Sequence, residues 1–506
     1  MKKLTVAAAP SAAVPLAAGA GAGSFGASPT ASASTRSGPS LWPVFAVTSL
    51  GAFVVSLDLS IVNVAFPAMA QAFPEASRSE LAWVITAYSI AFGSLLVVGG
   101  RSGDRNGLRR VFFAGLATFT LGSALCGLAP SVASLVAGRV LQGVGAAFTL
   151  PSSVGLLLAA VPQERRSQTV ALWGGVGALA VATGPSLGAL IVAHAGWRWA
   201  FYVNLPVGAL AWLWGRSVLP NPAPARAAAA ERPDYLGALL LSLTVATLTL
   251  AISEGGGWGW TDPRVVTAAI AAPLLGVLFV LRSSLHPAPV LDLALFRERS
   301  FAVANLATLA YAMGFFAMLL GNILFLTDVW HYSITRAGLA VTPGPLVVAL
   351  VSGFAGRLAV RVGFRAVLLP GSLCFAAGLL WFAVSVGAEP AYLRQWLPGT
   401  LLIGLGIGLT FPVLSAAAVS SLPAERFGVG SAVNQTARQV GGSIGIAVLV
   451  LILGRPNTSA EALAHFHWLW LFGAAMALTS GAIATQLGPV AVRERPVATA
   501  PQANPT

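Results

Sequence analysis

The sequence predicts an all-α protein that crosses a membrane many times, and three observations lead to this fold class. The chain has 506 residues, of which 56% are hydrophobic and only 9% are charged, whereas soluble domains carry about 25% charged residues. Its mean hydropathy is +0.80. Apolar runs long enough to cross a bilayer of about 30 Å recur along most of the chain. The 55 glycines fit the same class, because glycine lets membrane helices approach closely.

Residues 1–40 are mostly Ala, Ser, Gly and Pro, and we expect a disordered cytoplasmic tail because they cannot bury a core. A signal peptide is the alternative, but prolines and glycines interrupt its apolar segment. Fourteen apolar runs follow, and each predicts one transmembrane helix. The runs cover residues 42–70, 81–100, 111–129, 133–160, 169–193, 199–215, 235–253, 265–281, 301–327, 337–356, 366–387, 397–421, 429–453 and 468–487. Residues 489–506 are expected to form a second disordered cytoplasmic tail.

The distribution of arginine predicts which side of the membrane each loop faces. If the first run starts in the cytoplasm, the inner loops hold sixteen arginines and the outer loops only six. Cytoplasmic loops carry the excess of basic residues in membrane proteins, so both termini are predicted to be cytoplasmic. The same short basic loops account for the net charge of +13 without a nucleic-acid partner.

Paired aromatic residues lie near the proposed outer ends of the spans. They are Trp197 and Trp199, Trp258 and Trp260, Trp330 and Tyr332, Tyr392 and Trp396, and Trp468 and Trp470. Amphipathic rings prefer the membrane–water interface, so these pairs support the predicted boundaries.

A weak internal repeat suggests how the spans are grouped. The segment 100–109 joins the second and third spans, and the similar segment 356–365 joins the tenth and eleventh. If six-span halves repeat, the halves are residues 41–218 and 301–488, and residues 219–300 hold an inserted helix pair with its flanking loops. Parallel halves around a central cavity are a design used by transporters.

An acidic residue lies deep inside the first apolar run, in the stretch from Leu57 to Pro67. Asp58 has no basic residue near it in sequence, and a carboxylate at that depth costs at least about 2.5 kcal/mol on insertion scales. It should therefore face a protein interior or a wet cavity. Removal from water favours the protonated form of a carboxyl group, which would let Asp58 take up and release protons near neutral pH. The alternative is a polar hinge that neighbouring helices satisfy.

A basic segment with several glycines joins the second and third runs. Gly107 permits a tight turn. Asp104 and the arginines of the segment can hold neighbouring helix ends together with charge-assisted bonds. A loop that only fixes topology through its charge is the alternative. The residues singled out in this loop are Gly100, Asp104, Arg105, Gly107, Arg109 and Arg110.

Arg139 lies inside the fourth apolar run and needs a counter-charge, hydrogen bonds or water. Gln142 follows one helical turn later on the same face. Because an arginine does not titrate usefully, we interpret Arg139 as tuning a nearby carboxylate, for which Asp58 is a candidate. A structural polar clamp between helices is the alternative.

The fifth run carries three glycines on one face, Gly177, Gly184 and Gly188, which permit close helix contact. Pro185 lies among them, removes one backbone donor and favours a kink.

Polar side chains also lie within the thirteenth run, at Asn434, Arg438 and Gln439. Arg438 and Gln439 either line a cavity or bind across helices, and the sequence leaves both options open.

Together these motifs make the chain resemble the major facilitator superfamily, specifically its fourteen-span branch of drug:proton antiporters. The resemblance runs from about Trp42 to Leu487. The stretch from Leu57 to Pro67 resembles the branch's first-span signature, and the segment from Gly100 to Arg110 resembles the family's gating motif. The stretch 135–147 matches the fourth-span motif, and 184–189 resembles the antiporter motif.

The resemblance implies the family fold, with two six-helix halves plus two inserted central helices. It also implies proton coupling or substrate recognition for Asp58, Asn63, Arg139 and Gln142, and gating for the loop between the second and third spans. The motif in the fifth span implies export rather than import.

The sequence therefore predicts a proton-coupled exporter of small amphipathic drugs or antibiotics in the inner membrane of a bacterium. We expect a monomer in the lipid bilayer, driven by the proton gradient, with no cofactor and no metal. No ATP-binding loop of the GxxxxGK[ST] type is present, and His465 with His467 supplies too few ligands for a metal site. A dedicated exporter of an endogenous metabolite and a proton symporter for a small solute remain alternatives. A membrane-embedded enzyme is disfavoured, because no cluster of nucleophiles lies at one interface.

Overall fold

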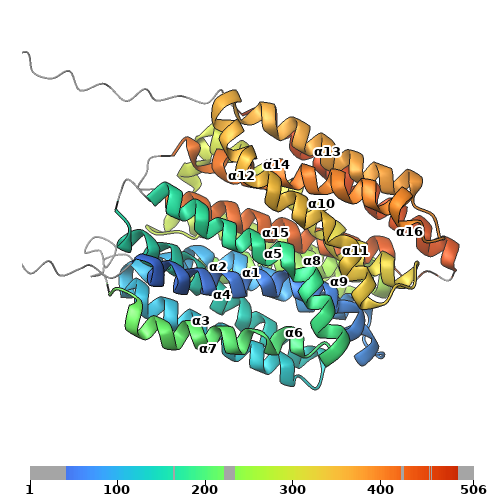
Figure 1. Ribbon diagram of the computed structural model, residues 1–506, viewed down its shortest axis with the longest axis horizontal. Helices are drawn as coiled ribbons and strands as arrows, with labels where there is room; N and C mark the ends of the chain where they lie inside the picture. Colours follow the sequence, from blue (N-terminus) through green and yellow to red (C-terminus); the bar gives the residue numbers. More distant parts are fainter. Residues whose placement is uncertain are drawn as a thin grey trace, which may run out of the picture. The chain divides into compact units, whose positions relative to one another are not determined.

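The computed structural model describes residues 41–162, 166–221, 234–422, 427–454, 456 and 458–487, so both predicted tails lie outside the described residues. The regular elements described are all helices (Figure 1). The first ten are α1 (Leu41–Ala72), α2 (Arg78–Asn106), α3 (Leu108–Leu128), α4 (Val132–Ala160), α5 (Arg166–Ala195), α6 (Trp199–Tyr202), α7 (Asn204–Val218), α8 (Tyr235–Trp258), α9 (Pro263–Leu285) and the 3₁₀ turn η3 (Leu293–Arg297). The remainder are α10 (Arg299–Asp328), α11 (Ile334–Val341), α12 (Pro343–Val362), α13 (Phe364–Ser385), the π-helical turn η4 (Tyr392–Trp396), α14 (Leu397–Ser420), α15 (Phe427–Leu453) and α16 (Ser459–Ala484).

The chain is a multi-pass membrane protein, because twelve segments of the described residues are long and apolar enough to cross a membrane. The expected count of fourteen is not confirmed. The predicted span 199–215 is divided between α6 and α7, since Pro206 has no backbone N–H to donate to the carbonyl of Tyr202. The predicted span 337–356 is divided at Thr342 between α11 and α12, where Pro343 starts the second helix, but Ile334–Val362 together is one of the twelve segments. α5 and the divided α6–α7 are not among the twelve.

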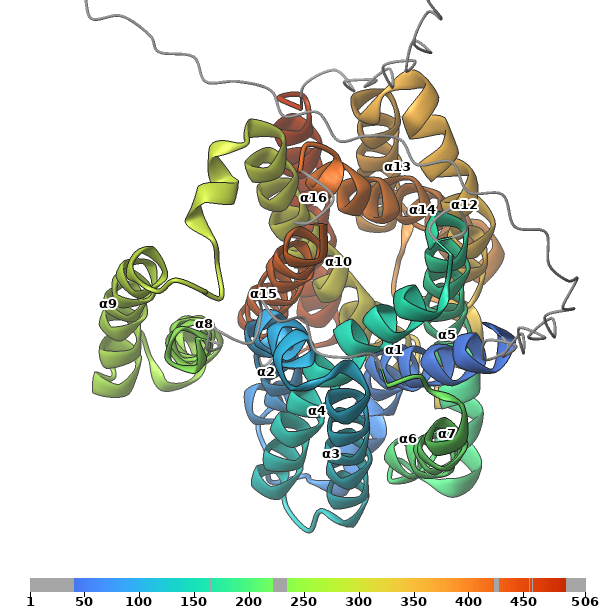
Figure 2. The same cartoon turned by 90° about the vertical axis from the view of Figure 1, so that its left-hand side faces the viewer.

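The helices pack as two groups with a pair beside them (Figure 2). We call α1–α7 the first helix group and α10–α16 the second. The α8–α9 pair packs on itself and places α8 against α2 and α15. The two groups meet at α2 with α15 and at α5 with α11 and α12. We call the end of the bundle that holds residues 73–77 the predicted outer end.

The prediction that Gly100 to Arg110 form a loop is wrong, because α2 continues to Asn106 and α3 begins at Leu108. Only Gly107 separates the two helices, with φ of 94°. Gly363 separates α12 and α13 with φ of 93°. Glycine adopts this left-handed region without the steric cost of a Cβ. The weak sequence repeat thus corresponds to one repeated helix–glycine–helix turn.

Glycines bring the helix backbones of each group into direct contact. A Cβ added to Gly145 of α4 would overlap the backbone of Phe119 in α3, and one added to Gly406 of α14 would overlap Phe375 in α13. Small residues at such crossings permit the close packing typical of membrane helices.

Several tryptophans that were predicted to lie at the membrane interface are instead in the protein interior. Trp330, Trp396 and Trp470 are at most 4% exposed, and Trp396 stacks on Phe382 with ring centroids 4.4 Å apart. The indole N–H of Trp470 donates to the side chain of Asn322 at 3.0 Å. Because a protein atom accepts from the indole N–H of Trp470, this ring needs no lipid headgroup, whereas the indole N–H of Trp396 has no partner among the described residues. Other residues of these pairs, Trp199, Trp258, Trp260 and Trp468, are exposed as expected.

We predict that Gly145→Ala destabilises the protein by about 1–3 kcal/mol, because the new methyl group forces α3 and α4 apart. The matched control is Gly353→Ala in α12, where an added Cβ meets no atom within 4 Å and helix propensity improves. Thermal unfolding of the purified proteins in detergent measures both effects. Equal midpoints for the two variants would contradict the close α3–α4 contact.

Candidate functional site

The centre of the candidate site is an ion pair buried inside the first helix group. Arg139 of α4 donates from Nη1 to Asp58 Oδ2 of α1 at 2.5 Å, and both side chains are 0% exposed. A charged group in a membrane interior requires such a partner. The counter-charge expected for Arg139 is therefore Asp58, eighty-one positions earlier in the chain.

Three polar side chains complete the coordination of this pair. Gln142 lies one turn after Arg139 on α4, as predicted, and donates to Asp58 Oδ1 at 3.1 Å while its Oε1 accepts from Arg139 at 2.8 Å. Asn204 at the start of α7 donates to the same Asp58 oxygen at 2.9 Å. Ser123 of α3 accepts hydrogen bonds from both Gln142 and Asn204. We call Asp58, Ser123, Arg139, Gln142 and Asn204 the Asp58 cluster.

Arg139 makes two further contacts that hold its guanidinium in place. Its Nε donates to the carbonyl of Val84 at 2.8 Å, and its Cζ lies 4.1 Å from the centre of the Tyr88 ring, within range of a cation–π interaction. Its Nη2 has no hydrogen-bond partner among the described residues. The cluster is electrically balanced while Asp58 is ionised. Protonation of Asp58 would leave the buried Arg139 charge without a counter-charge.

The glycine face of α5 packs against α1 on either side of Asp58. A Cβ added to Gly184 would overlap Ser60, and one added to Gly188 would lie 3.2 Å from the Cα of Ile61. Gly177 faces Ser56, with 3.4 Å between its added Cβ and the serine Oγ. The predicted shared face of these glycines is thus the α1 contact.

The opposite side of α5 contacts the second helix group. A Cβ added to Gly338 of α11 would lie 2.7 Å from the carbonyl oxygen of Pro185, and Ser186 Oγ lies 2.6 Å from Thr342 Oγ1. α5 therefore contacts both the Asp58 segment of α1 and the second helix group within the same few helical turns.

The residues singled out in the segment from Gly100 to Arg110 lie away from the Asp58 cluster. Arg109 donates to the carbonyl of Arg216 near the end of α7 at 2.5 Å. Asp104 and Arg110 are exposed, Gly100 and Arg105 are half-buried, and Gly107 is buried. Of the charge-assisted bonds expected between helix ends here, Arg109 supplies one, which joins α3 to α7 within the first helix group.

Asn63 is the one proton-coupling candidate that the structure does not bring into the cluster. Its amide donates to the carbonyl of Leu59 on its own helix at 2.7 Å, and its Oδ1 has no partner among the described residues.

The second helix group has a polar chain of its own. Asn434 of α15 donates to Thr308 of α10 at 2.9 Å and accepts from Ser415 of α14 at 3.2 Å. Arg438 donates to the same serine at 2.9 Å. Gln439, 1% exposed, lies at the contact between the groups, where a Cβ added to Gly93 of α2 would meet its Cβ at 2.7 Å.

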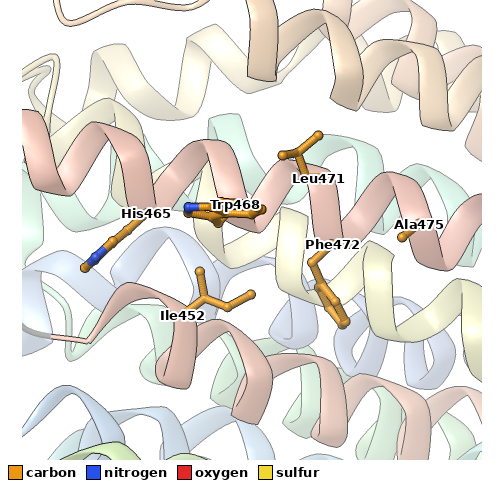
Figure 3. A pocket seen from close by; sticks show the side chains of 6 residues that line it. All are labelled: Ile452, His465, Trp468, Leu471, Phe472 and Ala475. Atoms are coloured by element: carbon orange, nitrogen blue, oxygen red, sulfur yellow. The ribbon is translucent and has the colours of Figure 1, made fainter.

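A separate groove of about 590 Å³ lies between α15 and α16 and is mostly apolar (Figure 3). It is lined by Ile452, His465, Trp468, Leu471, Phe472 and Ala475, none of which belongs to the Asp58 cluster. His465 contacts the carbonyl of Leu453 and His467 contacts that of Val386. Within the described residues, no group of three or more His, Cys, Asp or Glu side chains could hold a metal ion.

Sequence reasoning did not identify three of the residues around the Asp58–Arg139 pair. Asn204 carried a usable signal, since it is an asparagine inside a predicted span. Ser123 and Tyr88 carried none, because a single serine or tyrosine in an apolar run is too common to indicate a site.

We predict that Arg139→Met costs about 3–5 kcal/mol of stability, because Asp58 is left buried without a partner. Replacing both, as Asp58→Leu with Arg139→Met, should restore most of this loss. The matched control is Arg78→Met, which removes a partly exposed ion pair with Asp328 and should change stability by about 1 kcal/mol or less. Denaturation of the purified variants measures all three, and a double variant no more stable than Arg139→Met alone would contradict the pairing.

Comparison with known proteins agrees with this architecture. The sequence matches the family described as Major Facilitator Superfamily over residues 48–446, with a second match over residues 304–503. It is 35% identical over 409 residues to "Multidrug resistance protein Stp" of Mycobacterium tuberculosis, covering 80% of this chain and 74% of that protein. It is 34% identical over 430 residues to "Tetracenomycin C resistance and export protein" of Streptomyces glaucescens, covering 83% and 78%.

Two solved structures share the fold at low sequence identity. The xylose transporter XylE from E. coli, in a partially occluded inward open conformation, has a TM-score of 0.61 at 12% identity, covering 90% of this chain and 99% of that one. An auto inhibited POT family peptide transporter has a TM-score of 0.64 at 18% identity, covering 92% and 99%. From the helix arrangement and these matches, the chain belongs to the major facilitator superfamily.

Proposed function

We propose that this protein is a proton-coupled antiporter that exports amphipathic drugs or antibiotics across the cytoplasmic membrane. The observation that carries the proposal is the buried Asp58–Arg139 ion pair. Asp58 can take up a proton only if another group compensates the positive charge of Arg139. Relatives that are named as multidrug resistance and antibiotic resistance proteins support the cargo class. The relative named as a tetracenomycin C export protein supports a second candidate, a dedicated exporter of one endogenous compound.

The mechanism follows from the charge balance of the cluster. Protonation of Asp58 leaves Arg139 uncompensated in a medium where an unpaired charge is costly. The protonated state therefore favours a helix arrangement in which water or another protein group approaches the guanidinium, whereas cargo binds to the ionised state. Each state shifts the inward–outward equilibrium only by its differential binding energy.

The contact of α5 with α1 on one side and with α11 and α12 on the other gives this equilibrium a route to the second helix group. Any shift of α1 at Ser60 meets the backbone of Gly184 directly. The antiporter motif thus lies where the proton site and the movement of the groups would be coupled.

The complete topology is part of the proposal. We assign α5, which is 30 residues long, and the broken helix α6–α7 as the two spans that bring twelve to fourteen. Residues 41–218 and 301–488 are then the six-span halves, with α8 and α9 as the inserted pair in residues 219–300. Both termini are cytoplasmic, in a bacterial inner membrane, by the arginine distribution.

The contacts between the groups favour a state that is closed at the predicted outer end. Arg78 of α2 is paired with Asp328 of α10 at 3.0 Å. A small apolar cluster joins α1, α5, α10 and α11 at the same end of the bundle. It consists of Val64, Ala189 and Ile323, with Ile334 and Val341 packed against them.

Asp58→Asn should abolish proton-driven efflux, because an amide keeps the shape of the side chain but cannot exchange a proton. The readout is efflux of ethidium from cells that lack their own pumps, together with the amount of folded protein in the membrane. The control is Glu389→Gln, which changes an exposed acid outside the cluster and should leave efflux unchanged. Wild-type efflux in Asp58→Asn would remove Asp58 from the mechanism.

A second variant tests the movement of α5 against α12. Ser186→Cys combined with Thr342→Cys places two thiols where the hydroxyl oxygens lie 2.6 Å apart. Oxidation should lock the predicted outer end and stop efflux, and a reductant should restore it. Each single cysteine variant serves as the control. Full efflux by the cross-linked protein would show that this contact does not open during transport.

A further inference from the structure

Arg438, in the interior of the second helix group, is a cation that forms no ion pair with an acid among the described residues. It lies eleven residues after α15 begins at Phe427, about 17 Å along the helix axis and so near the middle of a bilayer-spanning segment. Its Nη2 donates to Ser415 Oγ of α14, and its Nε has no partner among the described residues. The described residues form ion pairs such as Arg78–Asp328, Arg139–Asp58, Arg282–Asp234 and His465–Glu461, and none of these involves Arg438.

A further buried acid, Glu254 on α8, does not neutralise Arg438. Glu254, 4% exposed, lies four residues before the end of α8. Its carboxylate points along its own helix towards Gly257, and the neighbouring Gly256 faces Leu451 of α15. Leu451 is thirteen residues beyond Arg438 on the same helix, about 20 Å away along the axis.

One aromatic ring lies beside the charge without cancelling it. The Cζ of Arg438 lies 4.3 Å from the centre of the Phe411 ring on α14. Phe411 in turn packs edge-to-face on Tyr311 and Phe315 of α10, with centroids 5.0 and 4.9 Å apart. A cation–π contact attracts a guanidinium but leaves its net charge in place.

The position of Arg438 is next to the contact between the two helix groups. Thr436 donates to the carbonyl of Gly93 in α2 at 2.6 Å, and Gln439 packs on the same glycine. Figure 2 shows α15 beside α2 of the first helix group. Arg438 itself is half-buried and turned towards α14. An anion bound there would therefore lie in the second group close to that contact.

We propose that Arg438, Ser415 and Phe411 form a binding site for the anionic group of the cargo, and that the cargo is an amphipathic aromatic compound with a carboxylate or phenolate. A guanidinium offers two parallel N–H donors to a carboxylate, and the Phe411 ring beside it is the group against which an aromatic cargo would pack. This inference rests on the proposed function, since it names the class of compound that is exported.

The test is equilibrium binding of two matched probes to the purified full-length protein in lipid nanodiscs. 9-Anthracenecarboxylate and its neutral amide share a ring system and differ in charge. Wild type should bind the acid about tenfold more tightly than the amide, as a charge-assisted bidentate contact allows. Arg438→Gln should weaken binding of the acid by about tenfold and change binding of the amide by less than about twofold. Arg438→Lys should keep a preference for the acid, because the charge remains.

Equal binding of acid and amide by wild type would overturn the inference, as would a preference that survives in Arg438→Gln. If Arg438→Gln does not fold, the ratio of acid to amide affinity in wild type and in Arg438→Lys tests the inference. Binding requires no proton gradient, so the result is independent of the proposed antiport. Proton-driven efflux of ethidium without any acid preference would sink this inference alone. An acid preference without proton-driven efflux of either ethidium or 9-anthracenecarboxylate would sink the proposed function alone.

Discussion

The buried ion pair between Asp58 and Arg139 constrains the rest of the first helix group. Two opposite charges in a low-dielectric interior are tolerated only when their geometry is good and their remaining hydrogen-bonding atoms find partners. Five helices contribute the charged groups and those partners, so α1, α2, α3, α4 and α7 must keep a fixed register. Glycine makes that register possible, since a Cβ added to Gly122 of α3 would lie 2.7 Å from the backbone nitrogen of Gln142.

The same pair explains why a helix next to it is built from small residues. α5 lies close to the Asp58 segment of α1, and Gly184 and Gly188 allow that approach. The charges of the second helix group are balanced differently. Its polar chain runs from Asn434 to Arg438, and none of its described acids pairs with the arginine. We interpret the two groups as complementary, with a proton site in the first and an anion site in the second.

Much of the architecture could be predicted from the sequence, because hydrophobic length, arginine placement and in-span charges are local signals. Arg139 and Gln142 are three positions apart, so their shared face followed from helix geometry. The contact of Asn204 with Asp58 could not be predicted, since it joins residues 146 positions apart. The helical continuation from Gly100 to Asn106 was also missed, because polar residues at a helix end resemble a loop in hydropathy. Trp396 and Trp470 were misplaced because pairing of aromatic rings across helices has no local signature.

The central claim is that Asp58 exchanges its proton in response to cargo. Its most direct test is the proton released when a compound known to be exported is added to purified wild-type protein in a weakly buffered solution with a pH indicator. The account predicts a proton release that saturates together with cargo binding. A binding event that is clearly measurable yet releases no proton would contradict it.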